Sequence, residues 1–354
     1  MKKIFFINSR LSNGGSERVM TILANYFSNI ENYDVHMILI REKNEETYEL
    51  NPNIKVHQLN YGTKNKILIL LKRIFQLRKI FKEQKPDVII SFMIDINIVT
   101  LCAGYKERKK IIVSERADPQ SNTRKKIQKK LEKILYPKCK KVVLQTDDVK
   151  KYYDKIKVFN TEVIPNPINE NILNPYEGER EKRLIAAGRL TEQKNFELLI
   201  RAFKRFADIY SEYLLEICGE GPLKSDLEQL VKNENIEDKV LFSGYVKNVN
   251  ERMRNATMYV SSSNFEGISN SMLEALAMGV PTISTDCPVG GAKMVIENGV
   301  NGILIPVGDE DALVNSMLKI VEDTEFAQQL SQKSILIKEK YSIEKIAKQW
   351  EKLF

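Results

Sequence analysis

Residues 258–278 read MYVSSSNFEGISNSMLEALAM. The apolar run Met258–Ser261 predicts a short buried strand, and Asn270–Met278 predicts a helix that follows it after a polar turn. Glu266 lies in the turn, and Glu274 lies about one turn inside the helix. The start of such a helix presents unpaired N–H groups and a partial positive charge, which favour a phosphate or another anion. Because glutamates are also common on solvated helix faces, the meaning of this pair depends on the rest of the chain.

Strand-like and helical patterns alternate along the whole sequence, which is typical of parallel sheets covered by helices. In the first half the predicted strands are Ile4–Ile7, Val35–Ile40, Val88–Phe92, Ile111–Ser114 and Val142–Leu144. In the second half they are Leu184–Ala187, Leu214–Cys218, Val240–Phe242, Met258–Ser261, Thr282–Ser284 and Ile303–Ile305. Helical patterns between them include 19–27, 67–82, 125–135, 196–210 and 223–233. The fold class is therefore predicted as α/β.

Two prolines in Val163–Ile168 interrupt this alternation and place the expected domain boundary. We expect two doubly wound, Rossmann-like domains at 1–165 and 166–342, with a last helix at 343–354 that packs back on the first domain. Folds of this kind bind ligands beyond the carboxyl ends of their strands, so a cleft between the domains is the expected site.

Composition and charge exclude several classes of protein. The 354 residues are 43% hydrophobic, enough for a sizeable core, and contain four cysteines without a C-x-x-C pair and two histidines. Neither a disulfide framework nor a zinc site is indicated. The net charge is +8, but residues 1–175 hold 33 basic and 19 acidic residues, against 22 and 28 in the remainder. The first domain is thus expected to face something anionic.

Four further short motifs follow predicted strands. Asn13-Gly-Gly-Ser-Glu17 opens a helix, and its glycines permit a close approach of the backbone to a ligand. Gly188-Arg-Leu190 with Lys194 offers two cations that can neutralise a diphosphate. Gly219-Glu-Gly-Pro222 and Gly244-Tyr-Val246 offer backbone groups to a nucleobase. Taken singly, the first motif fits a plain turn as well as a ligand site, and the other three fit a plain or solvated turn better.

Taken together and in this order, the motifs resemble those of the retaining glycosyltransferases of the GT-B fold, family 4. The resemblance extends over the chain and is strongest from Arg183 to Pro306. It implies transfer of a hexose or N-acetylhexosamine from a nucleotide sugar, with retention of configuration, in bacterial surface glycan synthesis. It implies no metal and no cofactor, with a UDP-sugar as co-substrate. The run Ser284–Gly291 is similar to that of members that use UDP-linked galactose, N-acetylgalactosamine or glucose.

The resemblance also implies roles for individual residues. Arg189 and Lys194 would stabilise the leaving diphosphate, Glu266 would hold the transferred sugar, and Glu274 would bind the ribose hydroxyls. The other expected donor-binding residues are Gly14, Gly15, Arg116, Gly188, Gly219, Tyr245, Val246, Gly267, Ile268, Ser269 and Asn270. Arg116, in Ser114-Glu-Arg116, stands where many relatives have a histidine that reaches the donor sugar, so its role is not carried over directly.

Two basic amphipathic helices are expected in the first domain. Residues 64–85 hold eight basic residues and one acid, and 124–135 holds six basic residues. We expect their apolar stripes to pack on the sheet. Their charge predicts contact with an anionic membrane and a polyprenyl-diphosphate-linked or other saccharide acceptor, with the enzyme cytoplasmic and peripheral on the inner face of the plasma membrane.

Two other functions remain open at this point. A nucleotide-sugar epimerase would share the fold but transfer nothing to an acceptor. A non-enzymatic basic protein that binds membranes would also explain the charge. Nucleic-acid binding is not expected, because aromatic residues do not alternate with the basic runs as stacking platforms would require.

Overall fold

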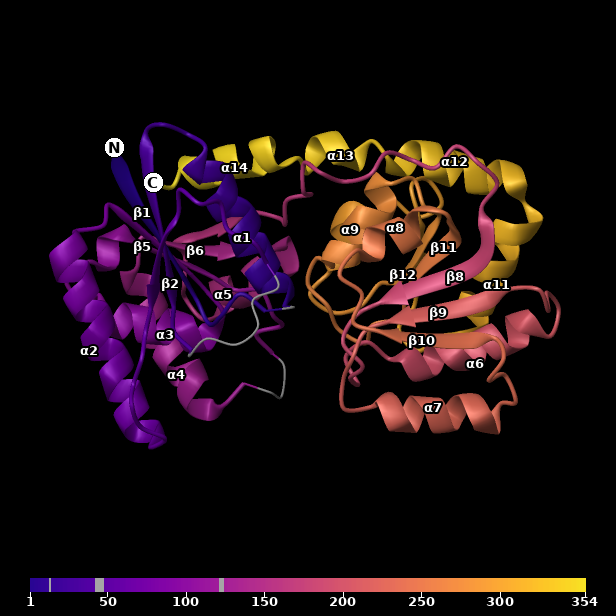
Figure 1. Ribbon diagram of the computed structural model, residues 1–354, viewed down its shortest axis with the longest axis horizontal. Coiled ribbons are helices and arrows are strands. Elements are labelled where there is room, and N and C mark those ends of the chain that lie inside the picture. Colours follow the sequence, from indigo (N-terminus) through magenta and orange to yellow (C-terminus); the bar gives the residue numbers. More distant parts are fainter. Residues whose placement is uncertain (13, 42–47, 121–123) are drawn as a thin grey trace. The chain divides into compact units, whose positions relative to one another are not determined.

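The computed structural model describes residues 1–12, 14–41, 48–120 and 124–354. It divides the chain into two compact units (Figure 1). Unit 1 comprises Met1–Pro167 and Ile343–Phe354, and unit 2 comprises Ile168–Ser342. Each unit is a parallel sheet with helices on its faces, which confirms the predicted α/β class with two Rossmann-like domains.

Unit 1 contains a seven-stranded sheet in the order β3-β2-β1-β4-β5-β6-β7, with all neighbours parallel. Its strands are β1 Lys2–Asn8, β2 Tyr33–Leu39, β3 Lys55–Gln58, β4 Val88–Phe92, β5 Ile111–Ser114, β6 Lys141–Leu144 and β7 Thr161–Val163. Its helices are α1 Gly15–Ser28, α2 Lys66–Gln84, α3 Ile94–Ala103, α4 Lys126–Leu135, α5 Asp147–Lys155 and α14 Ile343–Glu351, with short 3-10 turns at Arg108–Lys110 and Tyr136–Lys138. The run Ile4–Ile7 of β1 is fully buried, as expected for a central strand covered on both faces.

Unit 2 contains a six-stranded parallel sheet in the order β10-β9-β8-β11-β12-β13. Its strands are β8 Glu181–Ala187, β9 Leu214–Cys218, β10 Val240–Gly244, β11 Ala256–Ser261, β12 Thr282–Thr285 and β13 Ile303–Ile305. Its helices are α6 Phe196–Ala207, α7 Lys224–Asn233, α8 Val249–Arg254, α9 Asn270–Ala277, α10 Gly291–Val295, α11 Glu310–Glu322, α12 Thr324–Ser334 and α13 Ile337–Lys340. The main apolar core lies between the sheet and α6, α7 and α11, while α8 and α9 cover the opposite face.

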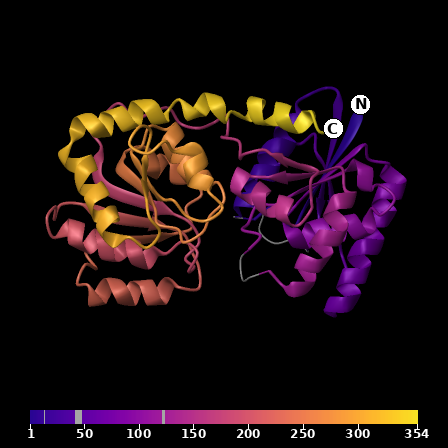
Figure 2. The same ribbon diagram turned by 180° about the vertical axis from the view of Figure 1, so that it is seen from behind.

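The last helix, α14, belongs to unit 1. Figures 1 and 2 show it in yellow beside α1, from which it is separated by more than 300 residues of chain. Trp350 is fully buried and stacks on Phe92 with ring centroids 5.7 Å apart. Phe354 contacts Phe27 at 5.0 Å. The chain therefore returns to unit 1 through an aromatic contact that closes its core.

The apolar stripe of α2 departs from the sequence-based expectation. Only Leu77 and Phe81 are fully buried, near the end of the helix. Five large apolar side chains in its first half are 44–71% exposed, namely Ile67, Leu68, Leu70, Leu71 and Phe75. The expectation that this stripe packs on the sheet is therefore wrong for the first half of α2, because its apolar side chains are exposed there and burial begins only at Leu77. On α4, Ile127 and Ile134 are also exposed, by 65% and 44%.

None of the helices in the described part of the chain is both long enough and apolar enough to cross a membrane.

The buried Trp350 yields a first prediction. Trp350→Ala is expected to lower the free energy of unfolding of unit 1 by about 3–5 kcal/mol, because it removes a fully buried ring and leaves a cavity. Trp350→Phe is expected to cost only about 1–2 kcal/mol, since the Nε1 atom of Trp350 has no hydrogen-bond partner among the described residues. Denaturant unfolding of the two variants measures the difference, and equal losses would contradict this account of α14.

Candidate functional site

Two of the predicted motifs meet at the carboxyl edge of the sheet in unit 2. In the parallel pairing of β8 with β9, Ala187 lies opposite Cys218, so the turns that begin at Gly188 and Gly219 leave the sheet side by side. The N–H of Gly188 donates to the carbonyl of Cys218 at 3.0 Å, and the N–H of Leu190 donates to that of Glu220 at 2.9 Å. A Cβ at Gly219 would lie 1.9 Å from the carbonyl oxygen of Gly188. Glycine at 219 is thus required by a close approach of two backbones.

Lys194 and Glu266 form an ion pair between the loop after β8 and the turn after β11. The Lys194 side chain lies along Gly188, where an added Cβ would be 2.7 Å from its Cε atom. Ser263 also donates to the Glu266 carboxylate, at 3.0 Å. The side chains of Lys194 and Glu266 are only 14% and 20% exposed. Burial alone would lower the pKa of Lys194, but the charge of Glu266 and its hydrogen bond to Lys194, together with Tyr259 and Cys287, outweigh burial and raise the pKa.

The predicted helix after β11 is present as α9, and serine hydroxyl groups make hydrogen bonds in its first turn. Ser269 is its N-cap residue and accepts from the N–H of Met272. Ser271 contacts the hydroxyl of Tyr259 at 2.7 Å and that of Ser269 at 3.1 Å. Glu274 lies inside α9 and is 3% exposed. Glu266, which pairs with Lys194, and the N-terminus of α9 therefore lie close together in sequence and belong to the same unit.

The structure adds one position that the sequence interpretation gave no role. A Cβ at Gly291, the first residue of α10, would lie 1.9 Å from the carbonyl oxygen of Gly267. Close packing of α10 against the turn therefore holds the 267–268 backbone in place. The paired glycines Gly290-Gly291 are the signal that pointed to such an approach.

The turn after β10 carries Tyr245 and Val246, which the resemblance places beside the base. Tyr245 is 43% exposed. Gly244, with φ of 62°, adopts a left-handed conformation, and a Cβ there would lie 3.8 Å from the Glu220 carboxylate. The turns after β8, β9 and β10 thus lie next to one another along one edge of the sheet. Arg189, in the turn after β8, is exposed.

The remaining predicted residues, Gly14, Gly15 and Arg116, lie in unit 1. Asn13 lies outside the described residues. Gly14 is the N-cap residue of α1, and Gly15 is its exposed first residue. The carboxylate of Glu17, which accepts a hydrogen bond from Ser16 at 2.7 Å, already lies against Gly14, where an added Cβ would be 2.0 Å from Oε2.

Arg116 packs inside unit 1. Its Nη1 donates to Asn166 at 2.6 Å, and its guanidinium lies over the rings of Phe92 and Trp350 at 4.4 and 5.8 Å. Its Nε and Nη2 atoms are buried without an acceptor among the described residues. Burial lowers the pKa of Arg116 to about 9, against the opposing effect of Glu115. Two donors of this side chain therefore remain for an oxygen ligand.

The described residues contain no group of three or more His, Cys, Asp or Glu side chains arranged to hold a metal ion. The chain does contain one Asp-x-Asp sequence, Asp309-Glu-Asp311. Asp309 caps α11 by accepting from the N–H of Ala312, and Asp311 pairs with Arg205 at 2.8 Å. These acids thus have structural partners.

The contact between the two turns yields a second prediction. Gly219→Ala is expected to lower the free energy of unfolding by roughly 2 kcal/mol or more, because the new methyl group overlaps the Gly188 carbonyl. Gly178→Ala is the control, since an added methyl there meets only the ring end of the Tyr176 side chain, and we expect a change within about 1 kcal/mol. Thermal or denaturant unfolding measures both, and a Gly219→Ala variant as stable as the wild type would refute the contact.

Comparisons with known proteins assign this arrangement to a family. Residues 169–336 match the family described as glycosyl transferases group 1, and residues 13–171 match glycosyltransferase family 4. Over 360 residues the chain is 30% identical to a Campylobacter jejuni α-1,4-N-acetyl-D-galactosaminyltransferase whose substrate is GalNAc-α-(1→4)-GalNAc-α-(1→3)-diNAcBac-PP-undecaprenol, covering 100% of this chain and 98% of that protein. A second C. jejuni enzyme, an N-acetylgalactosamine-N,N'-diacetylbacillosaminyl-diphospho-undecaprenol 4-α-N-acetylgalactosaminyltransferase, is 29% identical over 91% of both chains.

Solved structures agree with the fold. Sucrose-phosphate synthase from Thermosynechococcus elongatus superposes with a TM-score of 0.83 at 19% identity, covering 100% of this chain and 98% of the other. HepE of Anabaena in complex with UDP gives 0.81 at 17% identity, with 99% of both chains covered. The family matches, the full-length relatives and the two parallel sheets together identify the chain as a member of the family 4 glycosyltransferases of the GT-B fold.

Proposed function

We propose that this glycosyltransferase moves a hexose or N-acetylhexosamine from a UDP-sugar, with retention, to a saccharide carried on polyprenyl diphosphate in bacterial surface glycan synthesis. The names of two relatives that match over most of their length describe transfer of N-acetylgalactosamine to undecaprenyl-diphosphate-linked saccharides, which supports this acceptor class. HepE of Anabaena, which has a similar fold, was solved with UDP, and this supports the nucleotide.

The observation that carries the proposal is the Lys194–Glu266 pair at the sheet edge of unit 2. A largely buried cation and a largely buried acid lie beside the glycine turns that begin at Gly188 and Gly219 and near the start of α9. A diphosphate would gain the ammonium and the helix N-terminus, while the acid would accept hydrogen bonds from sugar hydroxyls. The two groups neutralise each other in the pair, and a bound donor would exchange this pair for contacts with diphosphate and sugar.

The chemistry follows from these charges. The acceptor hydroxyl oxygen bonds to the anomeric carbon as the bond from that carbon to the diphosphate breaks. The departing phosphate oxygen takes the proton of the hydroxyl on the same face, so configuration is retained without a protein nucleophile. Lys194, with its raised pKa, stays positive and stabilises the growing charge on the diphosphate together with Arg189. This electrostatic stabilisation is the main catalytic contribution that we assign to the chain.

We assign the other predicted residues to the donor. Glu274 would bind the ribose diol, and the backbone of Gly267, Ile268, Ser269 and Asn270 would bind the sugar and phosphate. Tyr245 and Val246 would border the base, and Gly188 and Gly219 would allow the diphosphate close to the backbone. In unit 1, Gly14, Gly15 and the free donors of Arg116 would meet phosphate or acceptor oxygens.

The proposed site predicts the effect of Arg189→Ala. Because Arg189 is exposed, its loss is expected to leave the melting temperature unchanged, yet to lower the rate of sugar transfer by about 10²–10³-fold. The measurement is product formation from UDP-N-acetylgalactosamine, UDP-galactose and UDP-glucose, followed by mass analysis, with a polyprenyl-diphosphate-linked saccharide as acceptor.

Arg201→Ala is the matched control, because Arg201 is a 43%-exposed arginine of the same unit that pairs with Glu197 and Glu234. We expect its transfer rate to stay within about twofold of the wild type. Full activity of Arg189→Ala would remove Arg189 from the site. Epimerised donor without any transferred sugar would refute a transferase acting on this acceptor.

We also propose that unit 1 binds an anionic membrane on the cytoplasmic side through α2. Its first half exposes Ile67, Leu71 and Phe75 by 58–71%, next to the exposed cations Lys64 and Lys66. Each basic residue near an anionic leaflet contributes about 1 kcal/mol, and apolar side chains add the gain of leaving water. An acceptor on a polyprenyl anchor lies at such a surface, so this face would bring the enzyme to its substrate.

Phe75→Ser is expected to weaken sedimentation with vesicles that contain anionic phospholipid by roughly tenfold, because one ring no longer enters the bilayer. Phe159→Ser is the matched control, since Phe159 is a phenylalanine of the same unit with 72% exposure against 69% for Phe75. Its vesicle binding is expected to equal that of the wild type. Equal loss in both variants, or equal binding to neutral vesicles, would contradict the role of α2.

A further inference from the structure

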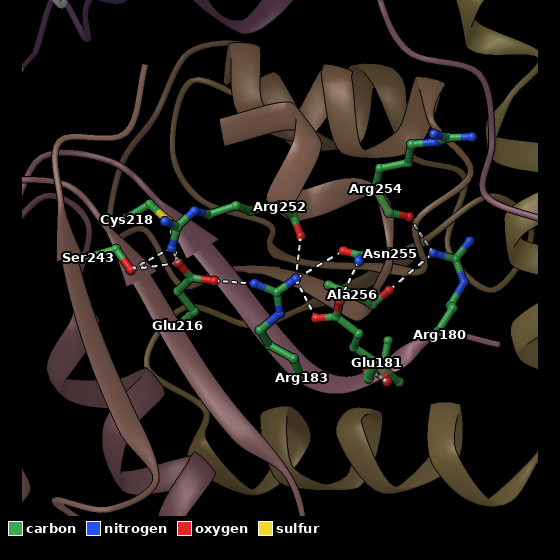
Figure 3. A network of polar contacts seen from close by, with 11 residues as sticks. Arg180, Glu181, Arg183, Glu216, Cys218, Ser243, Arg252, Arg254, Asn255 and Ala256 are labelled. Atoms are coloured by element: carbon green, nitrogen blue, oxygen red, sulfur yellow. Dashed lines mark hydrogen bonds and ion pairs between the residues drawn. The ribbon is translucent and has the colours of Figure 1, made fainter. Parts of the chain in front are cut away.

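A buried carboxylate lies under the predicted base-binding turn of unit 2. Glu216, in the middle of β9, is 1% exposed and points to the face of the sheet that α8 covers (Figure 3). Its neighbour on the same face is Cys218, whose thiol donates to Oε1 of Glu216 at 3.6 Å. The main apolar core lies on the other side of the sheet, where Leu215 and Ile217 pack. A charged group thus occupies a position where an apolar side chain would ordinarily pack.

Two arginines and a serine hold this carboxylate. Arg183 of β8 pairs with Oε2, and Arg252 of α8 pairs with Oε1. Ser243, near the end of β10, donates to the same Oε1 at 2.5 Å. Burial would raise the pKa of Glu216, but the hydrogen bonds from Ser243 and Arg252 and the charge of Arg183 outweigh burial and lower the pKa. The group is therefore ionised in the folded chain.

Arg183 also fastens the far end of α8. Its Nη2 donates to the carbonyl of Arg252 and to the side chain of Asn255, each at 2.9 Å. Figure 3 shows both arginines converging on Glu216 from two different elements. The six-residue helix α8, which also buries Met253, is thus held to the sheet by ion pairs and hydrogen bonds that require defined geometry.

The segment 244–251, from the last residue of β10 into α8, is flanked by two residues that bind the same oxygen atom. Ser243 precedes the segment and Arg252 follows it, and both donate to Oε1 of Glu216. Arg252 also contacts the Ser243 hydroxyl at 3.2 Å. Between these two residues lie Tyr245 and Val246, the residues assigned to the base. The buried carboxylate of Glu216 therefore links the residues on either side of Tyr245 and Val246.

We propose that Glu216 is a positioning residue for nucleobase recognition: it holds the segment 244–251 by its two ends and so keeps the base-binding backbone ready for the ligand. The inference rests on the proposed function, because it takes Tyr245 and Val246 as the border of the base. A segment already ordered before binding loses less conformational freedom on binding, so the network raises affinity for the base without touching it. The diphosphate contacts of Arg189 and Lys194 come from other turns and do not depend on it.

Arg252→Gln tests this role, because it opens one end of the loop while Arg183 still neutralises the buried acid. We expect the Kd of UDP and the KM of the UDP-sugar to rise about fivefold, with kcat within about twofold of the wild type. The Kd of inorganic pyrophosphate, which lacks a base, is expected to remain unchanged. Arg252→Lys keeps the positive charge and is expected to recover part of the UDP affinity.

Arg205→Gln is the matched control. Its side chain is 47% exposed against 45% for Arg252, and like Arg252 it pairs with carboxylates of another element in the same unit, here Glu310 and Asp311 of α11. We expect UDP and pyrophosphate to bind this variant as they bind the wild type. Melting temperatures of all variants separate loss of stability from loss of recognition.

The outcomes distinguish the inference from the function on which it rests. If Arg252→Gln melts earlier but binds UDP as tightly as the wild type, the network serves stability alone and the positioning role is overturned. If the affinities for UDP and pyrophosphate fall equally, the variant disturbs the whole site and the role is again overturned. If the wild type binds pyrophosphate but shows no preference for UDP, the assignment of the base to this edge fails, and the inference fails with it.

Discussion

Parallel pairing of neighbouring strands is the constraint on which the candidate site depends. In a parallel sheet every strand ends at the same edge, so the residues that follow β8, β9, β10 and β11 emerge together. Gly188 and Gly219 meet because β8 and β9 are neighbours in register, and Lys194 reaches Glu266 because β8 also pairs with β11. Motifs that are 78 residues apart in sequence, from Gly188 to Glu266, thereby share one surface.

Both units keep a buried acid, paired with arginine, close in sequence to a predicted ligand residue. In unit 1, Glu115 directly precedes Arg116, and it pairs with Arg124, which also binds Glu132 at 2.8 Å. In unit 2, Glu216 lies three residues before Gly219. Buried ion pairs contribute little net stability when desolvation is included, but losing one partner is costly. Their physical effect is geometric, because they tolerate only one arrangement of the elements that they join.

Unit 1 combines the excess of basic residues with an exposed apolar surface. The excess of basic residues coincides there with a helix whose first half leaves large apolar side chains in water. Exposed apolar groups of this size are costly unless another phase or a partner covers them. A lipid surface satisfies both features, whereas nucleic acid would satisfy the charge alone. The aromatic closure of the unit by α14 leaves this face uncovered.

The amino-acid sequence by itself determined the fold class, most strands and the order of the motifs, because buried strands are apolar runs and the turns after them need glycine. Strands β4, β5, β9 and β13 match the predicted limits residue for residue. Strand β3 was not predicted, since Lys55, His57 and Gln58 form no apolar run, and only pairing with β2 makes this polar edge segment a strand.

Only the tertiary structure decided which side chains pair. Contacts between distant segments leave no signal in a local pattern. Three such contacts are the ion pair of Lys194 with Glu266, the ion pair of Glu216 with Arg252 of α8, and the packing of Gly291 against Gly267. The same holds for α2, where the sequence shows an apolar stripe but not which part of it is buried. Periodicity reports which face of a helix is apolar, whereas the surrounding chain decides whether that face is buried.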